Sequence, residues 1–349
     1  MSRNGTEPGG TADAEGSRKV SVGEIAEMAG VSPSTVSKVI NGRPGVAEET
    51  RRNVERLLRE QDYAKPLVST KISPTIELVL EYIEHNGTME LVKYATAWAQ
   101  RAGLALTVTQ TGTGVATEEV LRGIIDRNPQ GVIMQQMGGF DDTAKELFHS
   151  RGIPVVVIDP IEAVDPEVMS VAIDNWTGGY QAGRHLLDLG HRRIAAIRGP
   201  MHMQTALARF NGFASALGQA GVPLPDEYVR DGDYFPAETS YEAACALLEM
   251  DEPPTAIFCC NDLSAVSTYR AAREHGVALP AGLSVMGFDD VFPASYLMPT
   301  LSTIHQPFDE IAQRAVQLII DARAGRVTDP HVVYPTYLVA RDSTVPPMA

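Results

Sequence analysis

The residues with the clearest chemical potential lie between positions 32 and 41, where small hydroxyl groups accompany one lysine and one amide. The spacing of the valines among them predicts a short helix whose exposed side carries Ser34, Ser37 and Lys38. A lysine there can donate to O6 and N7 of guanine, while hydroxyl groups and the N–H groups at helix starts bind phosphates. The candidates for nucleic-acid contact are Ser32, Pro33, Ser34, Thr35, Ser37, Lys38 and Asn41.

A second group of polar residues follows apolar, strand-like segments later in the chain. Asp159, Asn261 and Asp289 each stand at the carboxyl end of such a segment, where open α/β sheets bind ligands. Carboxylates, an amide and a guanidinium suit a polyhydroxylated ligand, because each hydroxyl needs donors and acceptors. A structural role in a strand-end turn is the alternative for each aspartate. The candidate ligand-binding residues, including aromatic faces for a sugar ring, are Asp159, Trp176, Arg209, Asn261, Asp289, Glu81 and Phe140.

Three short helices are predicted to position the first group. Ser21 and the glutamate three residues later form a capping box for the first helix, which ends at Gly30. The second helix begins at Pro33, after a serine N-cap. The third covers about 47–61, and its N-cap position falls on Ala47, which is about 1 kcal/mol poorer than serine.

The remaining chain, after a polar linker over 67–74, alternates strand-like runs with helical patterns. This alternation predicts parallel sheets covered on both faces, and about 270 residues are too many for one open sheet. We therefore expect two α/β lobes. Strands are expected at 76–82, 104–109, 131–135, 154–159, 193–198, 255–260 and 283–288, and helices at 90–101, 176–189, 237–249 and 263–275, among others.

Charge is distributed unevenly along the 349 residues. The formal net charge of −15 argues, taken alone, against a polyanionic partner. Residues 1–66, however, hold ten basic and ten acidic side chains, and 17–66 hold nine basic and seven acidic. The acidity therefore belongs to the predicted lobes, and the N-terminal helices remain suited to a DNA groove.

Several classes of protein are disfavoured by the sequence. No stretch approaches the roughly 18 apolar residues of a membrane helix, and the polar N-terminus does not match a signal peptide. Three cysteines give neither a disulfide framework nor a metal spacing. Dinucleotide-binding, Walker, zinc-protease and nucleophile-elbow patterns are missing. We expect a cytoplasmic protein without cofactor, metal, catalytic site or membrane partner.

The N-terminal segments 26–32, 35–42 and 46–51 closely resemble the helix-turn-helix of the lactose-repressor (LacI/GalR) family of bacterial transcriptional regulators. Similarity continues in shorter blocks over the rest of the chain. These blocks are 174–176, 185–187, 189–194, 209–213, 260–262, 284–290, 300–304 and 306–307.

The resemblance implies an α/β fold class, with a three-helix DNA-binding domain and a two-lobe effector domain like that of periplasmic binding proteins. The predicted boundaries are a disordered tail over 1–17, the helix-turn-helix domain over 18–66, a linker over 67–74 and the effector and dimerisation domain over 75–345. The first lobe is expected at 75–173 plus 305–331, and the second at 174–304 plus 332–345.

The implied function is a homodimeric, ligand-responsive regulator that binds a near-palindromic operator and represses carbohydrate-use genes, with a mono- or disaccharide between the lobes. A purine or another small molecule is the alternative effector. A cytoplasmic sugar-binding protein and a sugar-acting enzyme are the alternative classes. The family's hinge carries an Ala-Arg-x-Leu pattern whose leucine enters the minor groove. The segment 67–74 lacks it, so we expect operator reading to rest more on the major-groove helices and on a phosphate contact from Lys71.

Overall fold

The computed structural model describes residues 20–40, 45–61, 63, 72–83, 86–111, 117–135, 142–160, 168–233 and 238–348. The predicted tail over 1–17, Asn41, Phe140 and most of the predicted linker lie outside these residues. Contacts between residues divide the chain into a small unit, which comprises Met1–Val68 and Ser150–Gly152, and a large unit that contains every described strand.

The small unit contains three helices where the sequence predicts them. They are α1 (Val22–Ala29), α2 (Pro33–Ile40) and α3 (Glu48–Glu60). The Ser21 hydroxyl accepts the Glu24 N–H at 3.3 Å, and the Ser21 N–H donates to the Glu24 carboxylate at 2.7 Å, which confirms the capping box. Gly30 ends α1 with a φ of 67°, a left-handed conformation that glycine adopts without strain.

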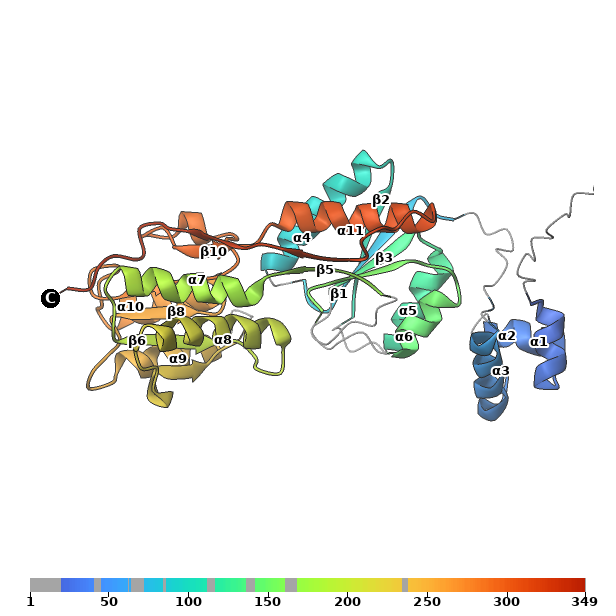
Figure 1. Cartoon of the computed structure of the whole chain (residues 1–349), viewed down its shortest axis with the longest axis horizontal. Coiled ribbons are helices and arrows are strands. Elements are labelled where there is room, and N and C mark those ends of the chain that lie inside the picture. The colour runs from blue at the N-terminus through green and yellow to red at the C-terminus, as the bar shows by residue number, and fades with distance from the viewer. Residues whose placement is uncertain are drawn as a thin grey trace, which may run out of the picture. The chain divides into compact units, whose positions relative to one another are not determined.

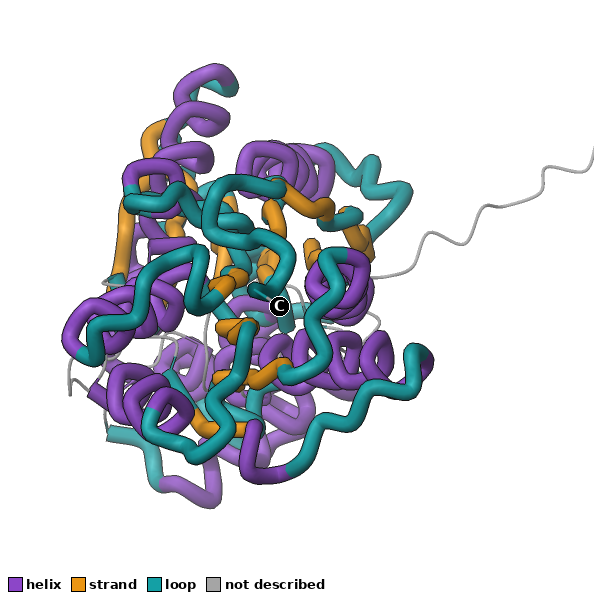
Figure 2. The backbone as a smooth tube through the Cα atoms, turned by 90° about the vertical axis from the view of Figure 1, so that its left-hand side faces the viewer, coloured by secondary structure: helices purple, strands orange, loops and turns teal. Residues whose placement is uncertain are grey.

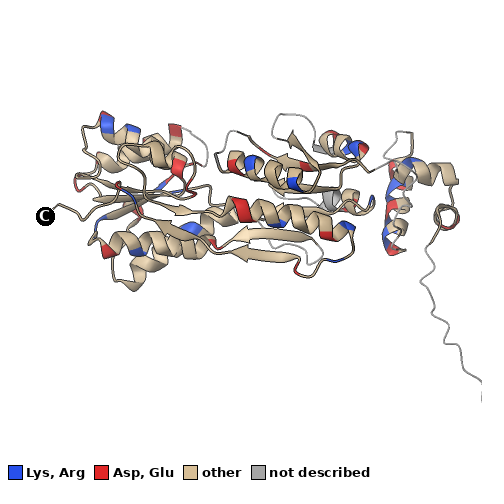
Figure 3. Ribbon diagram, turned by 90° about the horizontal axis from the view of Figure 1, so that it is seen from above, with Lys and Arg blue, Asp and Glu red and all other residues tan. Residues whose placement is uncertain are grey.

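The predicted start of the second helix is also confirmed. The Ser32 hydroxyl accepts the Thr35 N–H at 3.1 Å, so Ser32 is the N-cap of α2. Ala47 precedes α3 and provides no side-chain cap. Charged side chains of both signs lie along α3 (Figure 3), while its apolar face joins the core of the unit. The buried core residues are Ile25, Ala26, Val36, Val39, Val54, Leu57 and Tyr63.

Two parallel sheets form the framework of the large unit (Figures 1 and 2). The first has the order β11-β5-β4-β3-β1-β2 and the second the order β7-β6-β8-β9, while β10 and β12 form a separate antiparallel pair. The strands of the first sheet are β1 (Thr75–Leu80), β2 (Ala105–Gln110), β3 (Gly131–Gln135), β4 (Val155–Ile158), β5 (Met169–Ile173) and β11 (His331–Tyr334). The others are β6 (Ile194–Arg198), β7 (Val229–Asp231), β8 (Ala256–Cys259), β9 (Ser284–Met286), β10 (Thr303–His305) and β12 (Tyr337–Val339).

Helices cover both faces of each sheet. In the first lobe, which is built on the six-stranded sheet, α4 and α11 pack on one face and α5 and α6 on the other (Figure 1). In the second lobe, built on the four-stranded sheet, α7 and α8 lie opposite α9 and α10. The helices are α4 (Asn86–Arg101), α5 (Thr117–Arg127), α6 (Asp142–His149), α7 (Asn175–Asp188), α8 (Gln204–Gln219), α9 (Glu238–Leu248), α10 (Asp262–Glu274) and α11 (Phe308–Arg323), with short 3-10 turns at Asp226–Tyr228 and Ala294–Tyr296. The predicted two-lobe α/β fold is confirmed.

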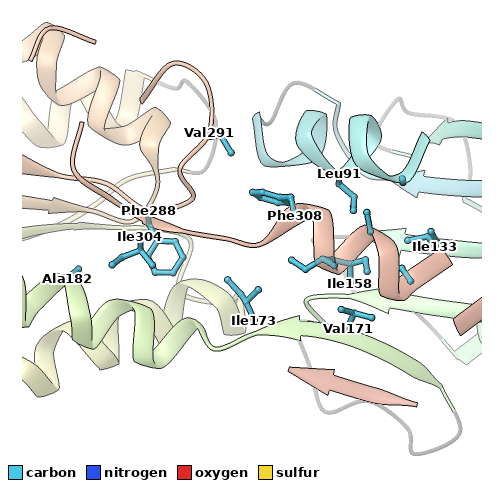
Figure 4. Close-up of a cluster of buried hydrophobic side chains, with 14 of the residues drawn as sticks. Leu91, Ile133, Ile158, Val171, Ile173, Ala182, Phe288, Val291, Ile304 and Phe308 are labelled. Carbon is cyan, nitrogen blue, oxygen red and sulfur yellow. The ribbon is translucent and has the colours of Figure 1, made fainter. Parts of the chain in front are cut away.

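The chain passes between the lobes three times, after β5, after β10 and after β11. A single cluster of buried apolar side chains extends across these crossings. Figure 4 shows it running from Ala182 on α7, past Phe288 and Ile304, to Ile173 at one crossing and Phe308 at another. The two lobes are therefore joined by packed side chains as well as by the backbone.

One predicted lobe boundary is wrong. The sequence places 332–345 in the second lobe, but Val332 pairs with Val171 in the parallel ladder between β11 and β5. The strand β11 therefore belongs to the first sheet, and the chain returns to the second lobe after Tyr334. The short strands β5, β7, β10, β11 and β12 were also missing from the predicted set, because runs of three to five residues carry little periodicity.

Candidate functional site

The small unit exposes the face of α2 that the sequence assigned to nucleic-acid contact. Ser34, Ser37 and Lys38 are exposed, while Val36 and Val39 on the other side are buried in the core. Ser32 and Pro33 are exposed as well, and Thr35 is half-buried. The Ser32 hydroxyl lies 2.7 Å from that of Ser34 and 2.9 Å from that of Thr35, so the hydroxyl groups form one cluster at the start of α2.

In the large unit, a close helix crossing brings together two of the site's elements. A Cβ atom added to Gly179 on α7 would lie 1.9 Å from the Arg209 carbonyl oxygen, and one on Gly212 of α8 would lie 1.9 Å from the Trp176 carbonyl oxygen. Only glycine allows the two backbones to approach this closely. The crossing places the first turn of α7 against the middle of α8.

Arg209 is the centre of the resulting cluster and is 5 % exposed. Its Nε donates to Asn175 Oδ1 at 2.8 Å, and its Nη1 donates to the Cys260 carbonyl at 2.8 Å. Nη1 also lies 3.0 Å from Asp289 Oδ1, and the guanidinium stacks 3.9 Å above the ring of Phe288. Burial at this position is tolerated because the charge is paired with Asp289 and the Nε and Nη1 donors are hydrogen-bonded.

Asp289 joins the cluster from the segment after β9. Gln306 Nε2 donates to the Oδ1 atom of Asp289 at 2.5 Å. Oδ1 therefore contacts both Gln306 and Arg209, whereas Oδ2 takes part in neither of these two contacts. The backbone has a φ of 117° at Asp289 and 58° at Asp290, an uncommon conformation for residues other than glycine. Consecutive residues in such conformations often mark functional positions, because the surrounding structure must hold them in place.

Asp159 follows β4 in the first lobe and faces the same charges. Burial raises its pKa to about 6, although a hydrogen bond from the Ile173 N–H and the positive charge of Arg209 lower it. The negative charge of Asp289 raises it further. Its Oδ1 accepts the Ile173 N–H at 3.0 Å, so Asp159 also has the turn-stabilising role that the sequence left open.

The structure places the other predicted ligand residues differently. Asn261 is fully buried and its Oδ1 caps α10 by accepting the Ser264 N–H at 2.8 Å. Trp176 is exposed on the first turn of α7, where its ring stacks on Tyr180. Glu81 directly follows β1 and is half-buried. Asp262 accepts a hydrogen bond from Thr303 and Asp290 accepts one from Arg341.

Three residues that complete the cluster were not among those predicted from the sequence: Asn175, Phe288 and Gln306. Each belongs to a block that resembles the family, but none lies in a sequence pattern that predicts ligand binding. Asn175 follows the N-cap of α7, where polar residues are ordinary, and Gln306 lies at a lobe crossing that only the fold reveals. Among the described residues, no group of three or more His, Cys, Asp or Glu side chains is placed to hold a metal ion. In the same part of the chain, no helix has the length and apolar character to cross a membrane.

The exposed helix of the small unit and the polar cluster of the large unit define a helix-turn-helix regulator with a two-lobed α/β body. Comparisons with known proteins support this class. Residues 21–65 match the profile of bacterial regulatory proteins of the lacI family, and 183–344 match that of the periplasmic binding protein-like domain.

A curated relative, the HTH-type transcriptional repressor PurR of Mannheimia succiniciproducens, is 32 % identical over 87 % of this chain and 92 % of its own. Among solved structures, the regulator CelR in complex with cellobiose has a TM-score of 0.72 at 28 % identity, covering 93 % of this chain and all of that one. The Lac repressor dimer bound to operator and the anti-inducer ONPF has a TM-score of 0.68 at 25 % identity, covering 94 % and all of that chain. The chain belongs to the lacI family of bacterial regulatory proteins and is a DNA-binding transcriptional repressor.

Proposed function

We propose that this repressor acts as a homodimer, reads its operator with the exposed face of α2, and responds to a small polar effector held at Arg209, Asp289 and Asp159. The observation that carries the effector proposal is the cluster around Arg209. It combines a buried guanidinium with a carboxylate and an amide, at the carboxyl ends of parallel strands.

For the operator, Lys38 is the cation that the exposed face of α2 offers to a base edge or a phosphate. We expect Lys38→Ala to weaken binding to a palindromic operator about tenfold in a mobility-shift assay. Lys93→Ala, which removes an exposed lysine of the large unit, is the matched control and is expected to leave the affinity unchanged. Equal affinities for both variants would contradict the assignment, and an affinity that is insensitive to salt would contradict phosphate contacts.

For the effector, a mono- or disaccharide is the first candidate. Its hydroxyl groups can donate to the carboxylates of Asp289 and Asp159 and accept from a guanidinium. The cellobiose complex of the similar structure supports this class. A purine base is the second candidate, which the family resemblance left open, and the curated relatives named PurR make it the class to test beside sugars.

The experiment is a thermal-shift screen of the full chain with monosaccharides, disaccharides including cellobiose, and purine bases, followed by operator binding with each hit. We expect one class to raise the melting temperature and to change operator affinity. Asp289→Asn should abolish the shift, while Asp188→Asn, which changes an exposed aspartate of α7, should retain it. A hit that survives Asp289→Asn would place the effector elsewhere. A purine hit without a sugar hit would reject the carbohydrate proposal.

The dimer proposal has its own support in the large unit. Phe292, Tyr296 and Met298 are 65 %, 76 % and 89 % exposed and lie within seven residues of one another. Clustered apolar exposure of this kind marks interaction surfaces. A second copy is the partner we propose, because a helix-turn-helix protein needs two heads to read a palindrome.

A further inference from the structure

The helix α11 runs the length of the first lobe, and both of its ends are fixed to functional segments. Its N-terminal end follows Gln306, whose side chain donates to Asp289 in the candidate effector site. Sixteen residues of helix span about 24 Å, since each adds about 1.5 Å. The C-terminal end therefore lies far from the cluster around Arg209, although one rigid element connects them.

At that far end, α11 holds the turn between α5 and β3. Arg323 Nε donates to the Gln130 carbonyl at 2.5 Å, and its Nη2 donates to the Pro129 carbonyl at 2.8 Å. One turn earlier in α11, Ile319 packs closely against Gly131, the first residue of β3. A Cβ atom added to Gly131 would lie only 2.5 Å from the Ile319 side chain. A guanidinium that bonds two carbonyls is a strong and directional contact, because both hydrogen bonds are charge-assisted.

The same turn holds the segment that arrives from the linker. The Ser73 N–H donates to the Asn128 carbonyl at 2.9 Å, and the Gln130 N–H donates to the Thr75 carbonyl at 2.8 Å. The Thr75 hydroxyl donates to that of Ser73 at 3.0 Å. Residues 72–74 are the last residues of the predicted linker that joins the DNA-binding helices to the large unit, so the turn over 128–130 holds the end of the linker that enters the large unit.

We propose that Arg323 is a positioning residue that couples the effector site, through Gln306 and α11, to the anchor of the linker at Ser73. This inference rests on the proposed effector response. A small displacement of the lobe crossing at Gln306 moves α11 as a body, because its packed face cannot deform gradually. Arg323 passes that displacement to the carbonyls of Pro129 and Gln130, and so to the segment bonded to them.

The test is amide hydrogen exchange of the full chain, measured on the peptides that contain Ser73 and Gln130. Arg323→Gln is expected to raise exchange there about tenfold, since it removes the two donors that hold the turn. Arg326→Gln is the matched control, because Arg326 lies three residues after the end of α11, is exposed, and places its guanidinium 3.5 Å from the carboxylate of Asp321. Equal exchange in the two variants would overturn the proposal.

A double-mutant cycle separates coupling from simple loosening of the turn. Gln306→Ala, made at the effector end, is expected to change exchange at Ser73 threefold or more in the parent chain and less than 1.5-fold in the Arg323→Gln background. An equal effect in both backgrounds, or none in the parent, would overturn the proposal. If Arg323→Gln does not fold, Arg323→Lys replaces it, because a lysine keeps the charge but loses the paired geometry. The test uses neither operator nor effector, so its failure is distinct from a loss of operator binding, which would contradict the proposed function.

Discussion

Arg209 shows how one side chain can organise a site built from distant parts of the sequence. Its guanidinium meets α7 at Asn175, the end of β8 at Cys260 and the segment after β9 at Asp289. A lysine could not make these contacts together, because its ammonium lacks the planar fork of donors. The residue therefore contributes to the shape of the second lobe as well as to the candidate site.

The buried pair leads to a prediction on stability. Replacing Arg209 with methionine leaves the carboxylate of Asp289 buried without its cation, and we expect the free energy of unfolding to fall by about 3–5 kcal/mol. Arg198→Met is the control, since its partner Asp231 is exposed and the Arg198–Asp231 pair should contribute no more than about 1 kcal/mol. Denaturant unfolding measures both. A similarly small loss of stability in the two variants would show that the buried Arg209–Asp289 pair contributes no more to the free energy of unfolding than the Arg198–Asp231 pair.

At the scale of elements, the helices of the small unit depend on their caps. Ser21 and Ser32 cap α1 and α2, but Ala47 gives α3 no side-chain acceptor. An aspartate at position 47 would accept an N–H of the first turn and place a negative charge at the positive end of the helix.

We therefore expect Ala47→Asp to stabilise α3 by about 1 kcal/mol. The measurement is amide exchange across α3 in the full chain, which should slow. Ala47→Leu cannot cap and should leave exchange unchanged. Faster exchange in the aspartate variant would mean that the acidic first turn, which already carries Glu48 and Glu49, outweighs the new cap.

A second element, the C-terminal segment after β12, is bound to the second lobe through two histidines. His185 Nε2 lies 2.8 Å from the Thr344 hydroxyl, and His191 Nε2 donates to the Val345 carbonyl at 2.9 Å. Burial lowers the pKa of both histidines below the ordinary value of 6.5, because it disfavours the charged ring.

The direction of these pKa shifts predicts a pH dependence. The unfolded chain binds protons at higher pH than the folded one, so the stability from these neutral histidines is complete above pH 6.5 and is lost as the pH falls below it. Melting temperatures between pH 8 and pH 5 should show this loss. The double variant His185→Gln, His191→Gln should lose stability less steeply, whereas His202→Gln, which changes an exposed histidine, should follow the parent chain.

At the scale of the whole molecule, the proposed dimer determines whether two recognition helices act together. Tyr296→Asp places a charge in the exposed apolar group that also contains Phe292 and Met298, and we expect it to weaken self-association at least tenfold. Sedimentation at several concentrations measures this, and operator affinity should fall with it. Val333→Asp, at an exposed position on β11, is the control. Unchanged association in Tyr296→Asp would remove this surface from the proposal.

The confirmed predictions of helix starts and ends concern residues that lie close together in the sequence. The capping box at Ser21, the left-handed Gly30 and the start of α2 after Ser32 need only local backbone hydrogen bonds, which neighbouring side chains determine. The longer helices followed from periodicity over ten or more residues, and the longer strands from apolar runs of five to seven residues. The assignments of Asp159, Arg209 and Asp289 to ligand contact remain proposals, although the fold brings their charges together.

The sequence by itself thus determined the helix-turn-helix, the alternation of strands and helices, and the strand ends where polar residues gather. Only the tertiary structure decided that β11 joins the first sheet, that Gly179 and Gly212 let α7 and α8 meet, and that Asn175 and Gln306 complete the cluster. The physical reason is distance along the chain. Pairings between segments tens to more than a hundred residues apart depend on packing of the whole fold, and no local pattern specifies them.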